Sequence, residues 1–264
     1  MFDALIEPEG DGIGVAFTDR FDGVSLPPFD SLNLGRGGVD DAADIAANFD
    51  LLRRRLGVSK VVTVAQVHGT DVLEVTPDLA DAWRDGSELG VHGPTGVPLT
   101  EADAIVTRLP GVALCIRVAD CLPVVLADTA AGIIAAAHAG RVGLLAGVLL
   151  ATVDAMRRLG AQHIQAWTGP GICGRCYEVP QAMAEDAWAQ LPATKAKTIW
   201  GTPSIDLPAG AAAQLRDAGV TVTDLGRCTY ERSTLYSHRR DHGATGRQAA
   251  LVWRTDPWLV NLVS

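Results

Sequence analysis

The chain has 264 residues, of which 48% are hydrophobic, and its formal net charge at pH 7 is −9. This length and apolar content are sufficient for one large domain with a substantial core. The acidic excess argues against a general nucleic-acid-binding protein, because phosphate backbones are bound through an excess of Lys and Arg. The sequence contains no run of about 18 apolar residues, so it predicts no membrane span.

The N-terminus and the cysteines indicate the compartment. The first residues, MFDALIEPEG, lack the basic start and the apolar stretch of a signal peptide. The five cysteines are an odd number in a long chain. Such cysteines are typical of a reducing compartment, where thiols act as core residues, catalysts or metal ligands. We therefore expect a cytoplasmic protein.

The first half of the chain is predicted to consist mainly of strands. Short apolar runs and turn residues precede a helix over residues 41–56. Residues 77–100 are rich in Pro, Gly and charge, so they are expected to form a surface loop or insertion. Apolar and β-branched runs predict the strands of this half, at 61–67, 103–107, 112–118, 122–128 and 132–137.

The second half alternates between helices and strands. Residues 142–159 show a 3.6-residue apolar period and are followed by Gly160, which is a good helix stop. The remaining elements are predicted strands at 164–169, 220–225 and 249–254, and predicted helices at 180–190 and 207–218. Since some strands follow one another directly, the pattern predicts a single α/β (α+β) domain over 1–264, with mixed β-sheets flanked by helices.

Three potential metal ligands each follow an apolar run: His68, Cys121 and His138. In α/β folds, functional groups gather where the chain leaves the carboxyl ends of strands. Glycine lies close behind each histidine, at Gly69 and Gly140, and glycine permits tight turns that expose an imidazole. We therefore expect the three side chains to meet at the ends of three strands.

One thiolate and two imidazoles are preferred zinc ligands, and three protein ligands leave a fourth position open to water. Zinc-bound water ionises near neutral pH and can attack or deprotonate a substrate. The pattern has alternatives, because Cys121 could be a small buried hydrophobe and each histidine could bond only to backbone. Residue types and spacing therefore suggest the site without establishing it.

Other candidate residues carry weaker signals. Cys173 and Cys176 have the CxxC spacing of zinc and redox sites, but the sequence has no second CxxC that would complete a set of four thiolate ligands. Asp120 could orient a ligand imidazole or act as a base, and it could equally cap a turn. The segment 236–247 concentrates arginines that could bind an anion, or it could be a solvated loop.

The motifs together resemble those of a known family along nearly the whole chain. The resemblance is to the purine nucleoside phosphorylase family of YfiH and YlmD, formerly labelled multicopper polyphenol oxidases or laccase-domain proteins. The segments that carry the resemblance are DRFDGVS, SLNLG, QVHGTDV, VADCLPVVLAD, AAAHAGRVGLLAGVL, GPGICGRCYEV, DLGRCTY and LYSHRRDHGATGRQAALV. Their combination is far more specific than any single motif.

The resemblance implies a YfiH-like fold and a zinc-dependent enzyme that cleaves purine nucleosides with inorganic phosphate. Adenosine, methylthioadenosine, inosine and guanosine are the implied substrates, with adenosine deamination as a second activity. The implied metal ligands are His68, Cys121 and His138. The expected catalytic residues are Asp120, Cys121 and His138. We expect a monomer or homodimer without nucleic-acid or membrane partners. The candidate substrate-binding residues are Arg20, Asn33, Arg175 and Arg239.

Three other functions remain as alternatives. A multicopper oxidase needs a trinuclear cluster rich in imidazole, and the chain has only six histidines. A Cys–His hydrolase would use Cys121 as nucleophile and His138 as base, without a stoichiometric metal. A metal-stabilised binding module would bind nucleosides tightly without converting them.

Overall fold

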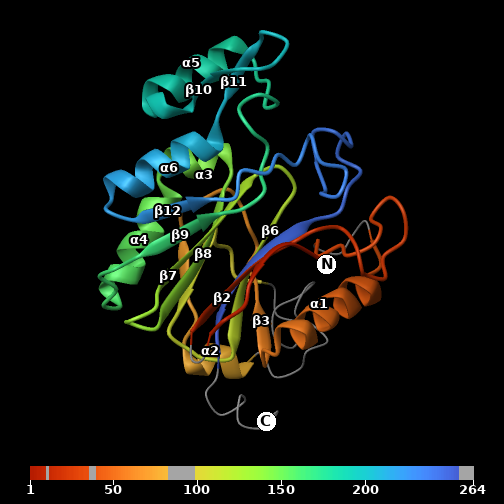
Figure 1. Cartoon of the computed structure of the whole chain (residues 1–264), viewed down its shortest axis with the longest axis vertical. Helices are drawn as coiled ribbons and strands as arrows, with labels where there is room; N and C mark the ends of the chain where they lie inside the picture. The colour runs from red at the N-terminus through yellow and green to blue at the C-terminus, as the bar shows by residue number, and fades with distance from the viewer. Residues whose placement is uncertain (10–11, 36–39, 83–98, 256–264) are drawn as a thin grey trace.

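The computed structural model describes residues 1–9, 12–35, 40–82 and 99–255. In the described part of the chain, two mixed β-sheets pack face to face and helices cover their outer faces (Figure 1). The predicted single α/β domain with mixed sheets and flanking helices is therefore confirmed.

The first sheet has five strands in the order β1-β2-β13-β6-β3, and only the β3–β6 pair is parallel. Its strands are β1 (Phe2–Ile6), β2 (Ile13–Thr18), β3 (Lys60–Val62), β6 (Val112–Val118) and β13 (Gln248–Arg254). Helix α1 (Ala42–Leu56) packs on its outer face through Phe49 and Leu52. Asp41 caps this helix by accepting a hydrogen bond from Ala43 N at 2.7 Å, so the predicted helix is confirmed.

The second sheet has six strands in the order β12-β9-β7-β8-β5-β4. Its strands are β4 (Val72–Glu74), β5 (Ala104–Thr107), β7 (Leu122–Asp128), β8 (Ile133–Ala139), β9 (Gln165–Thr168) and β12 (Thr221–Asp224). The helices α3 (Arg141–Ala146), α4 (Val148–Arg158) and α6 (Leu207–Asp217) cover its outer face. A hairpin of β10 (Lys195–Lys197) and β11 (Pro203–Ile205) lies beside α5 (Gln181–Gln190) and the short 3₁₀ helix Pro192–Thr194, at the top of Figure 1.

The central strands are apolar throughout because both of their faces are buried. On β7, Val124 and Leu126 pack toward the helices, whereas Val125 and Ala127 pack toward the first sheet. Successive side chains of a strand point to opposite faces, so a strand between two packed layers reads as a continuous apolar run.

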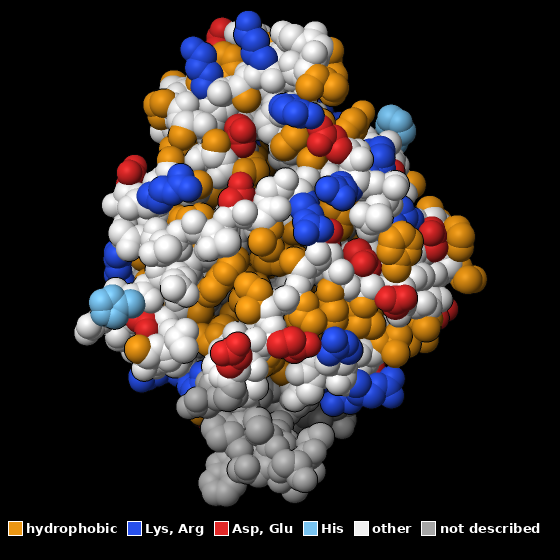
Figure 2. Space-filling view, viewed as in Figure 1, with side chains coloured by type: hydrophobic (Ala, Val, Ile, Leu, Met, Phe, Trp, Pro, Cys, Tyr) orange, Lys and Arg blue, Asp and Glu red, His pale blue; other side chains and the backbone are white. Residues whose placement is uncertain are grey.

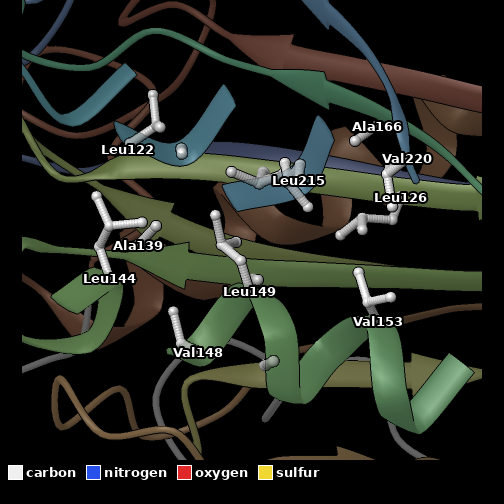
Figure 3. Packing of buried hydrophobic residues seen from close by; sticks show 14 of the residues in the cluster. Leu122, Leu126, Ala139, Leu144, Val148, Leu149, Val153, Ala166, Leu215 and Val220 are labelled. Carbon is white, nitrogen blue, oxygen red and sulfur yellow. The ribbon is translucent and has the colours of Figure 1, made fainter. Parts of the chain in front are cut away.

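The helical layer packs on the second sheet through aliphatic side chains (Figure 3). Leu149 and Val153 point from α4 toward the strands, and Leu126 lies on β7 opposite them. Leu215 of α6 belongs to the same cluster, and all four side chains are at most 1% exposed. This apolar layer packs against β8, the strand that contains His138, one of the potential metal ligands.

Two predicted elements differ from the structure. The helix expected over residues 142–159 is two helices, because Gly147 between α3 and α4 has a left-handed φ of 95°. The strand expected over 61–67 ends at Val62, and Ala65 pairs only in an isolated bridge with Glu101. Beyond Val62, the side chain of Gln66 rather than a strand partner engages the backbone of β6.

The segment predicted as a surface loop over residues 77–100 begins with the short helix α2 (Pro77–Ala82), and its residues 83–98 lie outside the described residues. No helix in the described ranges is both long and apolar enough to cross a membrane. Figure 2 shows acidic and basic side chains spread over one face, around an apolar area at its middle.

Candidate metal centre and adjoining cavity

Three separate segments bring the potential ligands together. Cys121 lies in the tight turn between β6 and β7, two strands that belong to different sheets. His138 lies on β8, one residue before its end, and His68 lies in the loop that follows β3. The ligand atoms of the three side chains all lie within 4.8 Å of one another.

The expectation that all three ligands follow strand ends is wrong in detail. His138 lies inside its strand, opposite Pro123 of β7. His68 is six residues past Val62 and has a left-handed φ of 63°, which is uncommon for a residue other than glycine. The loop is instead positioned by Gln66, whose side chain donates to Arg117 O at 2.8 Å and accepts from Arg117 N at 3.0 Å.

The cluster is buried on one side and open on the other. Cys121 Sγ lies 3.7 Å from His68 Nε2, and the two imidazole rings have their centroids 4.7 Å apart at 68°. His138 is buried, Cys121 is half-buried and His68 is exposed. An ion bound among them would therefore keep one side accessible, as catalytic zinc sites do.

Asp103, which the sequence analysis did not single out, positions two of the three potential ligands. Its buried carboxylate accepts hydrogen bonds from Val67 N, His68 N and Gly69 N at 3.1, 2.9 and 2.6 Å. The same carboxylate lies 2.8 Å from Nδ1 of His138. A proton on Nδ1 leaves Nε2 as the atom that can bind a metal, and carboxylates orient metal-binding imidazoles in this way.

The electrostatics of the cluster favour a positive charge at its centre. Burial opposes ionisation of the Cys121 thiol, but the imidazoles of His138 and His68 outweigh it and lower the pKa of Cys121 to about 6. Burial likewise opposes protonation of His138, yet Asp103 and Cys121 raise its pKa to about 9. The Cys121 thiolate and the Asp103 carboxylate therefore stabilise positive charge near the imidazoles, and a metal cation would supply such a charge. The donor set and its charges fit a zinc ion.

The two glycines behind the histidines have different roles. A Cβ on Gly140 would lie 2.7 Å from His68 Cδ2 and 3.1 Å from Cys121 Sγ, so a side chain there would displace both ligands. A Cβ on Gly69 would make only an ordinary contact, 3.5 Å from Asp103. Gly140 has an extended backbone with φ −68°, so its requirement is space rather than a tight turn.

Asp120 has a left-handed φ of 85° and is engaged away from the imidazoles. Its carboxylate accepts hydrogen bonds from Thr229 Oγ1 and from Arg239 N, both at 2.6 Å. Its carbonyl accepts from Ile172 N at 2.8 Å. These contacts fasten the turn that carries Cys121 to two other loops.

A cavity of about 460 Å³ opens onto the cluster. His68, Cys121 and His138 form part of its wall. The other lining residues are Phe29, Asn33, Gly35, Asp40, Gln66, Arg117, Val118, Ala119, His238, Gly243, Thr245 and Arg247. A cavity of this size accommodates a small-molecule ligand.

Of the predicted substrate-binding residues, only Asn33 lines this cavity. Arg20 forms an ion pair with Asp30 and lies over the ring of Tyr236. Arg175 is 69% exposed and paired with Glu231 at 2.8 Å. Arg239 donates from Nη1 to Glu178 O at 2.6 Å.

The cavity instead contains Arg117 and Arg247. Arg247 lies in the arginine-rich segment that the sequence pointed to, and Asn33 Oδ1 accepts a hydrogen bond from its backbone N at 2.9 Å. Arg117 is the single charged residue of an otherwise apolar strand, which is the signal that could have identified it. Because strands alternate faces, sequence alone does not tell which side of β6 the guanidinium occupies.

Comparisons with known proteins agree on one family. The family model described as multi-copper polyphenol oxidoreductase laccase matches residues 14–255. The chain is 45% identical over 247 residues to a purine nucleoside phosphorylase of Streptomyces coelicolor, covering 92% of this chain and 96% of the relative. It is 36% identical over 255 residues to the purine nucleoside phosphorylase YfiH of Escherichia coli, covering 93% and 96%.

The fold is similar to that of solved relatives. A Bacillus licheniformis protein described as hypothetical protein YfiH superposes with a TM-score of 0.81 at 27% identity. The match covers 92% of this chain and 93% of the other. The sequence resemblance and the YfiH-like fold that it implied are therefore confirmed.

Proposed function

The chain belongs to the family described as multi-copper polyphenol oxidoreductase laccase. Since the relatives to which it is 36–45% identical are named purine nucleoside phosphorylases, we propose that this chain is a purine nucleoside phosphorylase. Phosphate oxygen would attack the sugar carbon, the bond to the base would break, and its electrons would pass to the departing purine. The observation that carries the proposal is the near-full-length similarity to relatives with that name.

The proposed substrates are adenosine, methylthioadenosine, inosine and guanosine, with adenosine deamination as an accompanying activity. The cavity supports a ligand of this kind, since its volume lies in the range of small-molecule sites. Its wall combines the potential metal ligands with two arginines, so a nucleoside and an anion could be bound side by side.

We propose zinc as the cofactor, with His68, Cys121 and His138 as its ligands. When bound, zinc with an open position supplies a Lewis acid and can lower the pKa of a water molecule. The carboxylate of Asp103 directs Nε2 of His138 toward the cluster. For Asp120, the contacts with Thr229 Oγ1 and Arg239 N support a positioning role beside Cys121 rather than direct proton transfer.

Arg247 is our candidate for binding phosphate. It lines the cavity, and within the described ranges no carboxylate forms an ion pair with it. Its Nη1 donates to the carbonyls of Thr245 and Gly246 at 3.1 and 2.9 Å, which fix the guanidinium without neutralising it. Burial lowers its pKa, whereas the charges of Cys121 and Asp120 oppose that effect. A positioned, unneutralised arginine is well suited to an anionic co-substrate.

One observation favours a second candidate, a Cys–His hydrolase. The lowered pKa of Cys121 and the neighbouring His138 describe a thiolate–imidazolium pair, which is the activated form of a catalytic cysteine. Metal content separates the two candidates, because the hydrolase needs no stoichiometric metal. A copper oxidase is disfavoured, since the only potential metal group with imidazole in the described ranges has two histidines.

The proposal is tested by incubating metal-verified protein with adenosine in the presence and absence of phosphate. We expect free adenine and ribose 1-phosphate only when phosphate is present. Inosine is measured separately, because deamination needs no phosphate. Adenine release at the same rate without phosphate would establish a nucleoside hydrolase rather than a phosphorylase. Nucleoside binding without any product would establish a binding module.

The assignment of Arg247 has its own test. Arg247→Ala should raise the KM for phosphate by about tenfold or more, which is the worth of a charge-assisted hydrogen bond, and should change the KM for adenosine less. Arg239→Ala is the matched control, because that side chain is directed to Glu178 O outside the cavity. If Arg239→Ala changes the phosphate KM more than Arg247→Ala, the assignment is wrong.

A further inference from the structure

A second cluster of thiols lies apart from the cavity. Cys173 and Cys176 belong to the turn after β9, and Cys228 belongs to the loop after β12. The three sulfur atoms all lie within 4.8 Å of one another. Cys176 and Cys228 are buried and Cys173 is half-buried, so the cluster is shielded but reachable from one side.

Backbone hydrogen bonds hold the three cysteines so that their sulfur atoms could serve as ligands to one ion. Cys176 N donates to Cys173 O at 2.9 Å, which closes the CxxC turn, and Cys173 N donates to Cys228 Sγ at 3.4 Å. Tetrahedral zinc binds thiolates at about 2.3 Å, which places the sulfurs about 3.8 Å apart. The observed separations therefore need only small side-chain movements to enclose an ion.

A carboxylate and a counter-charge lie beside the three sulfur atoms. Glu231 Oε1 lies 3.6 Å from Cys176 Sγ and accepts a hydrogen bond from Arg175 Nη2 at 2.8 Å. Three thiolates and a carboxylate around a divalent cation leave a net negative charge. Arg175, inside the CxxC turn, partly balances that charge.

We propose that Cys173, Cys176, Cys228 and Glu231 form a second metal site, structural in role, for zinc. Binding forms three zinc–sulfur bonds and one zinc–oxygen bond and releases the thiol protons to solvent, with no change of oxidation state. A site with four protein ligands has no open position for substrate. Arg175, a candidate substrate-binding residue by sequence, pairs instead with a ligand of this metal site.

This second site would stabilise the loops that contact the Cys121 turn in the wall of the cavity. Thr229 follows Cys228; its backbone N donates to Gly171 O at 3.1 Å, and its Oγ1 donates to the Asp120 carboxylate. Asp120 directly precedes Cys121. The bound ion would therefore join two loops whose contacts position the turn of the first metal site.

The test is metal stoichiometry measured by elemental analysis on protein purified under reducing conditions. Wild type should contain about two zinc ions per chain, and Cys173→Ser and His68→Ala should each contain about one. Their combination should contain none. Cys115→Ala is the matched control, because Cys115 is a buried thiol outside both clusters, and it should retain the wild-type content.

Three further measurements test the proposal even if a cysteine variant does not fold. Cobalt(II)-substituted wild type should show the strong thiolate-to-cobalt absorption of a site with three sulfurs, and Glu231→Gln should lose metal to a chelator at least about tenfold more readily. After denaturation with a chelator, all five cysteines should react with a thiol reagent. A disulfide within the cluster, or unchanged zinc content in Cys173→Ser, would overturn the proposal.

Discussion

The geometry of the cluster formed by His68, Cys121 and His138 depends most directly on one buried carboxylate. Asp103 accepts hydrogen bonds from the loop that contains His68 and from the ring of His138, so a single side chain positions two potential ligands. Its pKa is lowered, because the hydrogen bonds from His138, Gly69 and Val67 outweigh the effect of burial. The carboxylate therefore remains ionised and complements a bound cation.

Replacing Asp103 by Asn should weaken zinc binding at this cluster by about 10–100-fold, because an amide has one acceptor oxygen where the carboxylate uses two. The measurement is competition with a chromophoric zinc chelator. Asp71→Asn is the matched control, since that side chain is exposed in the adjoining segment. Equal zinc affinity in Asp103→Asn and wild type would contradict the positioning role.

Gly140 and Gly69 provide a second contrast at the scale of single residues. Gly140→Ala should abolish or strongly weaken zinc binding while the fold persists, because its Cβ would lie 2.7 Å from His68 and 3.1 Å from Cys121. Gly69→Ala adds a methyl group at an ordinary contact distance and should bind zinc as wild type does. Circular dichroism checks the fold and calorimetric titration checks the metal. Full zinc affinity in Gly140→Ala would show that the ligands can move aside.

At the scale of elements, the ends of strands are joined by buried side chains as well as by backbone. Asp128, the last residue of β7, accepts hydrogen bonds from Ala131 N, Gln162 N and His163 N at 3.0, 2.7 and 2.8 Å. It thereby joins the β7–β8 turn to the segment between α4 and β9. Burial by itself raises the pKa of this carboxyl, but the three N–H donors lower it overall.

This lowered pKa predicts an acid-dependent loss of stability. The unfolded chain binds the proton at a higher pH than the folded one, so the contribution of Asp128 is complete above about pH 4 and decreases as the pH falls further. Asp128→Asn should lower the free energy of unfolding at pH 7 by about 1–3 kcal/mol and flatten its acid dependence. Urea denaturation at several pH values measures both, with the exposed Asp154→Asn as control. Parallel acid profiles for Asp128→Asn and wild type would contradict this account.

At the scale of the whole molecule, the cavity depends on how the two sheets pack. The turn that contains Cys121 crosses from β6 in one sheet to β7 in the other. The layer between the sheets includes Leu114, Ile116 and Val125, all with 0% exposure. Because both sheets share this layer, neither buries its inner face without the other.

Leu114→Ala should therefore destabilise the molecule by about 2–5 kcal/mol, the usual cost of a cavity in a close-packed core. Unfolding should remain a single transition by both circular dichroism and Trp fluorescence, since the two sheets share one core. Leu26→Ala is the control, because Leu26 is 72% exposed and its loss should change stability by less than about 0.5 kcal/mol. Two separate transitions would show that the sheets unfold independently.

The sequence alone determined the class of the fold, most of the elements and the three potential metal ligands. Apolar runs identify strands that are buried on both faces, and Cys121 and the two histidines are recognisable because few residue types bind zinc. It did not predict the break at Gly147, since the apolar period continues across it.

Only the tertiary structure decided which other residues join the site. Asp103 and Cys228 have ordinary sequence neighbours, and Arg247 is one of several arginines in its segment. Each is placed by groups far along the chain: Asp103 by the loop of His68, Arg247 by Asn33, and Cys228 by the CxxC turn. Arg20, Arg175 and Arg239 look equally suitable in sequence, yet each side chain is directed to a partner outside the cavity. Sequence specifies which side chains carry charge, whereas long-range packing decides where each charge points and whether another group already neutralises it.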